Sequence, residues 1–321
     1  MRKSYRIIPR HPTCQLPNRF EGQHVPSPRR VLILGCGYVG LELGRQLAAA
    51  GHRVFGARRS AGDDDRVRAA GCLPVVADVT QPQTLSTLPG RFDWVVNTVS
   101  SSRGGLDEYR AVYLEGSVNV IRWLSGAPPE AYVYTSSTSV YGQTDGSWVD
   151  ESSPAEPATD TGRILVEAEQ VLLRAAQERG FPARLLRVAG IYGPGRGHLF
   201  QQFIRGEPCG TGDPRRWLNM IHRDDVAGAL KAVLEYGTNG AIYNAADNEP
   251  VTQAAFLDWL AQQLGRPAAP VSTITPTRPR KRGLTNKRVS ARRLREEIGW
   301  VPRYPTFREG YAEELAALRL P

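Results

Sequence analysis

Short apolar segments alternate with amphipathic ones through most of the chain. Val31–Leu34 is apolar without a break, which is typical of a strand buried on both faces, and helical spacing follows it through Ala50. Helical patterns return over about Leu106–Leu124 and Gly162–Glu178. Further strand patterns occur at Arg53–Ala57, Cys72–Val76, Phe92–Asn97, Ala131–Ser136 and Ala183–Val188. Strands that alternate with helices at this spacing form right-handed βαβ units, so we predict an α/β fold of the Rossmann type, with a doubly wound parallel sheet.

The pattern changes on both sides of this region. Residues 1–29 have no helical or strand period and hold several prolines among basic residues, which predicts a flexible basic extension. After Gly193, prolines and glycines are frequent, and helices are expected near 224–236, 252–264, 290–297 and 308–318. We therefore predict a sheet domain over 30–193 and a smaller C-terminal lobe over 194–321, partly interleaved with the sheet domain.

A glycine motif follows the first predicted strand and opens a helix. Gly35, Gly37 and Gly40 form a G-x-G-x-x-G pattern in the strand-to-helix context that such a motif requires. The first glycine permits a tight turn, the second lets the backbone approach a pyrophosphate, and the third lets the helix pack closely on the strand. The free N–H groups of the helix N-terminus then face the phosphates. The motif predicts that 30–193 is a dinucleotide-binding domain.

The end of the second predicted strand favours NADP over NAD. An NAD site usually places Asp or Glu there, whereas this chain has Arg58 and Arg59, and guanidinium groups bind a 2′-phosphate. Two solvated surface arginines are the alternative. Asp78 is suited to accept from the adenine amino group, or equally to cap a turn. The predicted cofactor-binding residues are Gly35, Gly37, Tyr38, Val39, Gly40, Arg58, Arg59, Asp78, Val79, Asn97 and Thr98.

Charge and cysteine content narrow the choice of partners. The chain of 321 residues has 41 Lys and Arg against 32 Asp and Glu, a net charge of +9. The excess is concentrated in residues 1–30 and 278–297, and neither segment carries a recognised nucleic-acid motif, so we expect no nucleic-acid partner. No apolar run is long enough to span a bilayer and no signal-peptide core is present, so we expect no membrane association. Widely spaced cysteines predict no metal site and a cytoplasmic location.

Three segments together resemble the extended and atypical short-chain dehydrogenase/reductase superfamily, in its NAD-dependent epimerase/dehydratase group. They are Val133–Gly142, Leu186–Gly195 and Met220–Ala227, and the tail Leu284–Tyr311 also fits. The chain is most similar to the atypical bacterial branch of nucleoside-diphosphate-sugar epimerase-like proteins. The resemblance implies a small-molecule substrate, with a sugar nucleotide as one candidate, and a homodimer formed through the long helices.

The resemblance breaks at the catalytic residues. Active members use a Ser or Thr hydroxyl and a Tyr–Lys pair, and alignment places the hydroxyl on Ser137. The Tyr and Lys positions hold Thr161 and Leu165, and an Asn common in the long helix is replaced by Tyr113. A Thr hydroxyl is too weak an acid to replace the phenol, and an uncharged Leu side chain cannot lower the pKa of a neighbouring group. Other carriers of the proton are sought at Tyr113, Tyr141, Tyr192 and His222.

Two functions remain open. The resemblance implies an NAD(P)-dependent oxidoreductase or epimerase that acts on a nucleotide sugar or another carbonyl or hydroxyl compound by hydride transfer. The loss of the Tyr–Lys pair favours a catalytically impaired NADP(H)-binding sensor or regulator. The predicted catalytic residues are Ser137, Thr161 and Tyr113. The resemblance places the substrate in the C-terminal lobe, where we select Asn219, His222, Arg282 and Lys287; a solvated basic loop is the alternative for the cations.

Overall fold

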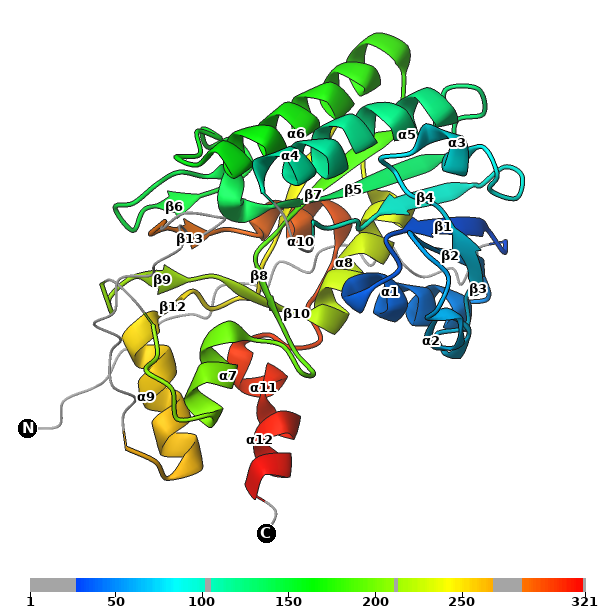
Figure 1. Cartoon of the computed structure of the whole chain (residues 1–321). Coiled ribbons are helices and arrows are strands. Elements are labelled where there is room, and N and C mark those ends of the chain that lie inside the picture. The colour runs from blue at the N-terminus through cyan, green and yellow to red at the C-terminus, as the bar shows by residue number, and fades with distance from the viewer. Residues whose placement is uncertain (1–26, 102–104, 211–212, 268–284, 320–321) are drawn as a thin grey trace, which may run out of the picture.

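The computed structural model describes residues 27–101, 105–210, 213–267 and 285–319, and its centre is a seven-stranded parallel sheet. The strand order is β11-β7-β5-β4-β1-β2-β3, which is the predicted doubly wound α/β arrangement (Figure 1). The strands are β1 (Arg30–Leu34), β2 (Arg53–Arg58), β3 (Leu73–Val76), β4 (Trp94–Asn97), β5 (Ala131–Ser137), β7 (Ala183–Val188) and β11 (Ile242–Ala245). The order reverses between β1 and β4, where open α/β sheets bind ligands.

The register brings three strand ends together at this point. Leu34 at the end of β1 pairs with Ala57 of β2 on one side and with Asn97 of β4 on the other. The loops that leave these strands therefore start side by side. Because β1 and β4 are covered on both faces, their apolar runs are almost continuous, with Val31, Leu32 and Val95 fully buried.

Helices cover both faces of the sheet (Figure 1). The helix predicted over Leu106–Leu124 consists of three consecutive segments, because a π-helical stretch interrupts its regular winding. On the opposite face, α1 packs against α8, which comes from the second half of the chain. The helices of this part are α1 (Tyr38–Ala49), α2 (Asp64–Ala69), α3 (Pro82–Leu85), α4 (Leu106–Tyr109), π-helical η1 (Arg110–Glu115), α5 (Gly116–Leu124), α6 (Asp160–Arg179), α8 (Arg223–Tyr236) and α10 (Arg292–Ile298).

A second apolar core holds together the C-terminal elements below the sheet in Figure 1. Its centre is a group of packed rings that includes Phe200, Phe256, Phe307 and Tyr311. The helices around it are α7 (His198–Ile204), α9 (Gln253–Leu264), α11 (Phe307–Gly310) and α12 (Ala312–Arg319). Short strand pairs lie between the two cores: β8 (Gly190–Tyr192) with β10 (Met220–His222), β9 (Trp217–Leu218) with β12 (Val251–Thr252), and β6 (Trp148–Val149) with β13 (Arg288–Val289).

The two halves of the chain are interleaved. β11 extends the sheet beside β7, although it follows β8, β9 and β10 in the sequence. The short 3₁₀ segment η2 (Thr138–Val140) continues β5 toward the C-terminal elements. Among the described helices, none is long and apolar enough to cross a bilayer. Residues 1–26 of the predicted extension and Arg282 lie outside the described residues.

Candidate active site

Three adjoining hollows follow the carboxyl ends of the strands. The first, of about 160 Å³, lies at the ends of β1 and β2, and the second, of about 130 Å³, shares Gly35, Gly37 and Thr98 with it. The third is a pocket of about 330 Å³ in the C-terminal half, and it shares Ser137, Ala189 and Ile191 with the second. The first two hollows therefore form one groove, and Ser137 lies where this groove opens into the pocket.

The glycine motif has the backbone geometry that a pyrophosphate site needs. Gly35 has a φ of 80°, and a Cβ there would lie 2.7 Å from Val99 Cα, so only glycine fits. A Cβ on Gly40 would lie 2.9 Å from Gly35 O. By contrast, a Cβ on Gly37 would meet nothing closer than 3.8 Å. The open space at Gly37, beside the uncapped N-terminus of α1, fits a bound phosphate group.

The arginines that end β2 line the first hollow, and each faces a carboxylate. Arg58 Nη2 lies 2.7 Å from Asp63 Oδ2, while Arg58 Nη1 donates to Cys36 O at 3.3 Å. Arg59 Nη1 lies 4.0 Å from Glu108 Oε1. Both guanidiniums are partly exposed, so the ion pairs are weak and a bound phosphate can compete with them. The hollow thus presents two guanidinium groups to an anionic ligand.

The other predicted cofactor residues divide into lining and supporting ones. Val79 lines the first hollow and Val39 the second. Asp78 also lines the first, but its Oδ1 accepts from Thr80 N and Thr80 Oγ1 at 2.9 and 2.8 Å and so stabilises a turn. Asn97 is buried and does not line the groove. Its Oδ1 accepts from Val99 N at 3.2 Å, which holds the turn against which Gly35 packs.

Tyr38 connects the glycine motif to the 193–197 turn. Its hydroxyl donates to Pro194 O at 3.2 Å, and burial raises the pKa of this phenol to about 12. The guanidinium carbons of Arg196 and Arg223 lie 5.1 and 5.3 Å from the Tyr38 ring centroid, within cation–π distance. Arg196 lines the second hollow. This arginine was not predicted from the sequence, although it directly follows the Gly193-Pro194-Gly195 segment.

Ser137 is the last residue of β5 and caps η2. Its Oγ accepts from Ser139 N at 3.2 Å, which fixes the side chain. The residue is only 7% exposed, yet it lines both the second hollow and the pocket. A hydroxyl held in this way can still donate its own proton. Ser137 is therefore placed to donate a hydrogen bond to a carbonyl oxygen at the junction of the groove and the pocket.

Thr161 and Leu165 lie on the first turns of α6. Thr161 Oγ1 lies 3.3 Å from Oγ1 of Thr159, the helix cap, and Thr161 is not part of the groove lining. Leu165 is 2% exposed and lines the second hollow, as Ser137 does, so an apolar side chain lies in the hollow where the resemblance implies a lysine. Tyr113 lines the same hollow from the π-helical η1, and its hydroxyl accepts from Ser101 N at 3.2 Å.

Two of the other proton carriers considered from the sequence lie outside the groove lining. Tyr141 OH donates to Asn244 Oδ1 at 2.9 Å and accepts from Arg187 Nη1 at 2.8 Å in a buried network. His222 caps α8 through a hydrogen bond from Asp224 N to its Nδ1 at 3.2 Å, and burial lowers the pKa of this imidazole. The Tyr192 ring does line the pocket, but its hydroxyl donates to Thr306 O at 3.3 Å.

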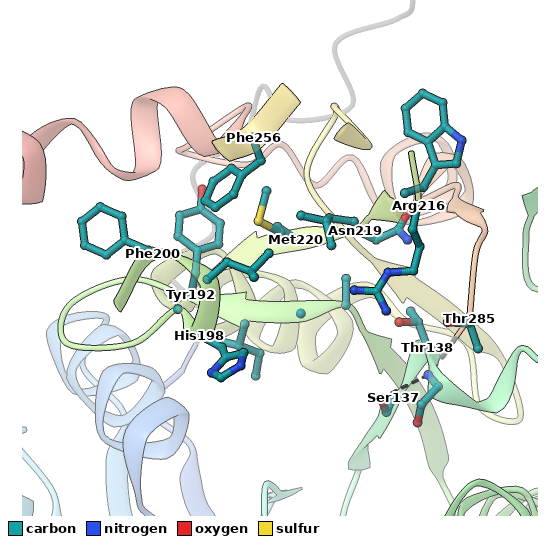
Figure 2. A pocket seen from close by; sticks show the side chains of 18 of the residues that line it. Ser137, Thr138, Tyr192, His198, Phe200, Arg216, Asn219, Met220, Phe256 and Thr285 are labelled. Atoms are coloured by element: carbon teal, nitrogen blue, oxygen red, sulfur yellow. Dashed lines mark hydrogen bonds between the residues drawn. The ribbon is translucent and has the colours of Figure 1, made fainter. Parts of the chain in front are cut away.

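The pocket combines cations with packed aromatic rings (Figure 2). Tyr192, Phe200 and Tyr311 form one wall, and Phe200 stacks on Tyr311 at 4.4 Å between ring centroids. Arg216, which was not predicted from the sequence, is directed toward the end of the pocket that holds Ser137 (Figure 2). Lys287 also lines the pocket. Because none of the described lining residues is Asp or Glu, the pocket suits an anionic ligand.

Asn219 and Lys287 are linked. Asn219 lines the pocket, but its Nδ2 donates to Lys287 O at 2.9 Å and its Oδ1 accepts from Val289 N at 2.7 Å. Asn219 therefore fixes the backbone on both sides of Arg288. The structure brings these two of the four predicted substrate residues together, and it places His222 elsewhere. Among the described residues, no cluster of His, Cys, Asp and Glu could hold a metal ion.

The sheet order, the glycine motif at its switch point and the groove define a dinucleotide-binding protein of the extended short-chain dehydrogenase/reductase type. The model of the NAD dependent epimerase/dehydratase family matches residues 31–246, and the chain belongs to this family.

Three known proteins are similar to this chain in sequence or in structure. Protein YeeZ of Escherichia coli is 29% identical over 242 residues, which cover 74% of this chain and 84% of that protein. A solved protein of Methylobacillus flagellatus, named as an NAD-dependent epimerase/dehydratase, is 34% identical and has a TM-score of 0.72, with coverage of 92% of this chain and all of that one. The dTDP-glucose 4,6-dehydratase DesIV of Streptomyces venezuelae, solved with NAD and TYD bound, has a TM-score of 0.79 at 21% identity, covering 90% and 97%.

Proposed function

We propose that the protein is an NADP(H)-dependent oxidoreductase that transfers a hydride to or from a carbonyl or hydroxyl carbon of an anionic small molecule. The observation that carries this proposal is the position of Ser137, which lines both the cofactor groove and the pocket. In the proposal, residues 30–193 bind the dinucleotide and residues 194–321 supply most of the pocket. We also propose, from the family resemblance, that the protein acts in the cytoplasm as a homodimer.

The residues of the groove fit a dinucleotide. Gly37 and the N-terminus of α1 would receive the pyrophosphate, and Arg58 and Arg59 would hold the 2′-phosphate that distinguishes NADP from NAD. NAD is the alternative, since NAD is bound in the DesIV structure. When bound, the nicotinamide supplies or accepts the hydride. Ser137 Oγ donates to the carbonyl oxygen, and this hydrogen bond strengthens as negative charge develops on the oxygen.

The pocket favours a negatively charged substrate. Arg216 and Lys287 supply the positive charge, and a nucleotide sugar would present its phosphates to them. The aromatic wall equally fits a different kind of substrate, an apolar carbonyl compound that carries an anionic group. A catalytically impaired NADP(H) sensor is the second candidate function. It is favoured by Thr161 and Leu165, because these residues cannot perform the roles of the Tyr–Lys pair.

Steady-state kinetics with NADPH and a panel of nucleoside-diphosphate ketosugars and aromatic ketones tests the proposal. We expect S137A to lower kcat by about 10²- to 10³-fold with unchanged NADPH affinity. The matched control is S125A, because Ser125 Oγ donates to Ile121 O within α5, away from the groove; it should retain full activity. Tight NADPH binding without turnover of any panel member would instead establish the sensor.

A further inference from the structure

Lys287 is a buried cation without an ionic partner in the described part of the chain. The residue is 4% exposed, and its Nζ donates to Tyr141 O at 2.8 Å and to Thr285 Oγ1 at 2.9 Å. Both acceptors are uncharged. Burying an ammonium group without an ionic partner costs free energy. We therefore expect the charge or the proton of Lys287 to serve a function.

The position of Lys287 relative to Ser137 suggests this use. Both residues line the same pocket. Ser137 begins the η2 turn and Tyr141 ends it, so the hydrogen bond to Tyr141 O ties the ammonium to the turn that carries the catalytic hydroxyl. Asn219 fixes the backbone of Lys287 from the other side. The amine is thereby held in one place, and two of its three N–H donors are used by the protein.

We propose that Lys287 is a further catalytic residue, which exchanges the proton that the missing tyrosine would otherwise carry. This inference rests on the proposed hydride transfer. In the reduction, a bound NADPH would supply the hydride that forms the new C–H bond as the C=O π bond breaks. The electron pair of that bond goes to the oxygen and takes a proton from Lys287 Nζ. The products are the alcohol, NADP⁺ and a neutral amine, which regains its proton from water. The oxidation runs through the same steps in reverse.

The surroundings of Lys287 allow this exchange near neutral pH. Burial lowers the pKa of the Lys287 ammonium to about 8. Charged and titratable groups on the neighbouring elements include Arg216 before β9, Arg288 on β13, Glu151 after β6, Arg187 on β7 and the pocket-lining His198, and none of them is a cause of this shift. Arg216 Nη2 donates to Gln253 and Arg288 Nε to Gly146 O, whereas Glu151 Oε1 accepts from Asn244 N. Protonated Lys287 is thus an acid of suitable strength for reduction.

Two substitutions separate proton transfer from simple anion binding. K287R keeps the positive charge but cannot release a proton at these pH values, and K287M removes both. We expect both variants to lower kcat by about 10²- to 10⁴-fold while NADPH affinity and the unfolding midpoint stay close to the wild-type values. If Lys287 only bound an anionic group, K287R would retain kcat and change mainly KM. The control is K231M, because Lys231 lies near Glu235 on the surface of α8.

The pH profile supplies a readout that a structural role would not move. The wild-type kcat for reduction should fall as pH rises through about 8, because the amine loses the proton that it donates, and kcat for oxidation should rise over the same range. This limb should disappear in K287M. Burial also raises the pKa of Asp247 to about 8, so D247N is measured in parallel and should keep the limb. An unchanged limb in K287M would overturn the proposal, as would full activity of K287R.

Titration of the amine by NMR distinguishes failure of this proposal from failure of the proposed function. In protein labelled with ¹³C at lysine Cε, the Lys287 resonance is assigned from its loss in K287R. A midpoint near 8 supports the proposal, whereas a midpoint near the ordinary value of about 10.4 overturns it with or without turnover. If the wild type turns over none of the carbonyl compounds, the hydride-transfer function fails, and the catalytic role of Lys287 fails with it.

Discussion

The two glycines that begin the cofactor loop should respond differently to the same substitution. A Cβ at Gly35 would meet Val99 Cα at 2.7 Å in a backbone with a φ of 80°, so G35A combines a clash with backbone atoms and a left-handed conformation. The conformation alone costs about 1–2 kcal/mol, and the clash adds to it. A Cβ at Gly37 has 3.8 Å of clearance, so G37A should change the free energy of unfolding by less than about 0.5 kcal/mol.

NADPH affinity, unlike stability, should respond mainly to the substitution at Gly37. The methyl group of G37A would project into the open space where the pyrophosphate is expected, so we predict at least about a tenfold loss of NADPH affinity in a protein of normal stability. Urea unfolding and isothermal titration with NADPH measure the two effects on the same samples. If G37A bound NADPH as tightly as the wild type, the pyrophosphate would not lie at Gly37. A G35A protein of wild-type stability would refute the steric reasoning.

Three further substitutions test other parts of the structure. R58Q should weaken NADPH binding by about tenfold and leave NADH binding nearly unchanged, as measured by parallel titrations; equal losses would contradict a 2′-phosphate contact. E169A should lower the free energy of unfolding by about 3–5 kcal/mol in urea, because the Arg187 guanidinium, 5% exposed and 2.7 Å from Glu169, loses its partner; a loss under about 1 kcal/mol would contradict a buried pair. Burial raises the pKa of Asp247 to about 8, so the folded state holds a proton that the unfolded state releases near 4, and stability should fall between about pH 4 and 8. D247N should flatten this fall, and an unchanged pH dependence would show that Asp247 titrates normally.

The sheet and the cofactor loop could be predicted because each imposes a recognisable pattern on a short run of consecutive residues. Val31–Leu34 is continuously apolar since both faces of β1 are covered, and Gly35 is required by a turn that its own backbone makes. The helix over Leu106–Leu124 was predicted as one regular element. The π-helical η1 that interrupts it was not predicted, because apolar residues three and four positions apart occur in both kinds of helix.

The pocket was harder to predict, because its residues meet only through the tertiary fold. Arg216 and Arg196 come from loops, where spacing along the chain does not determine the direction of a side chain. His222 was assigned to the substrate from its motif, but the structure uses its imidazole to cap α8. Lys287 was selected as one cation among several in a basic segment. Its hydrogen bonds to Asn219 and to Tyr141 at the end of η2 join residues that lie far apart in the sequence.

The central claim is that Ser137 marks the point where hydride leaves the cofactor for a bound carbonyl. The transfer of deuterium from NADPH that carries deuterium at both C4 positions of the nicotinamide tests this claim most directly. The experiment measures the mass of the alcohol formed from a panel ketone. We expect the alcohol from the wild-type protein to gain one deuterium, and S137A to form it about 10²- to 10³-fold more slowly. Unlabelled alcohol, or labelled alcohol formed by S137A at the wild-type rate, would contradict the claim.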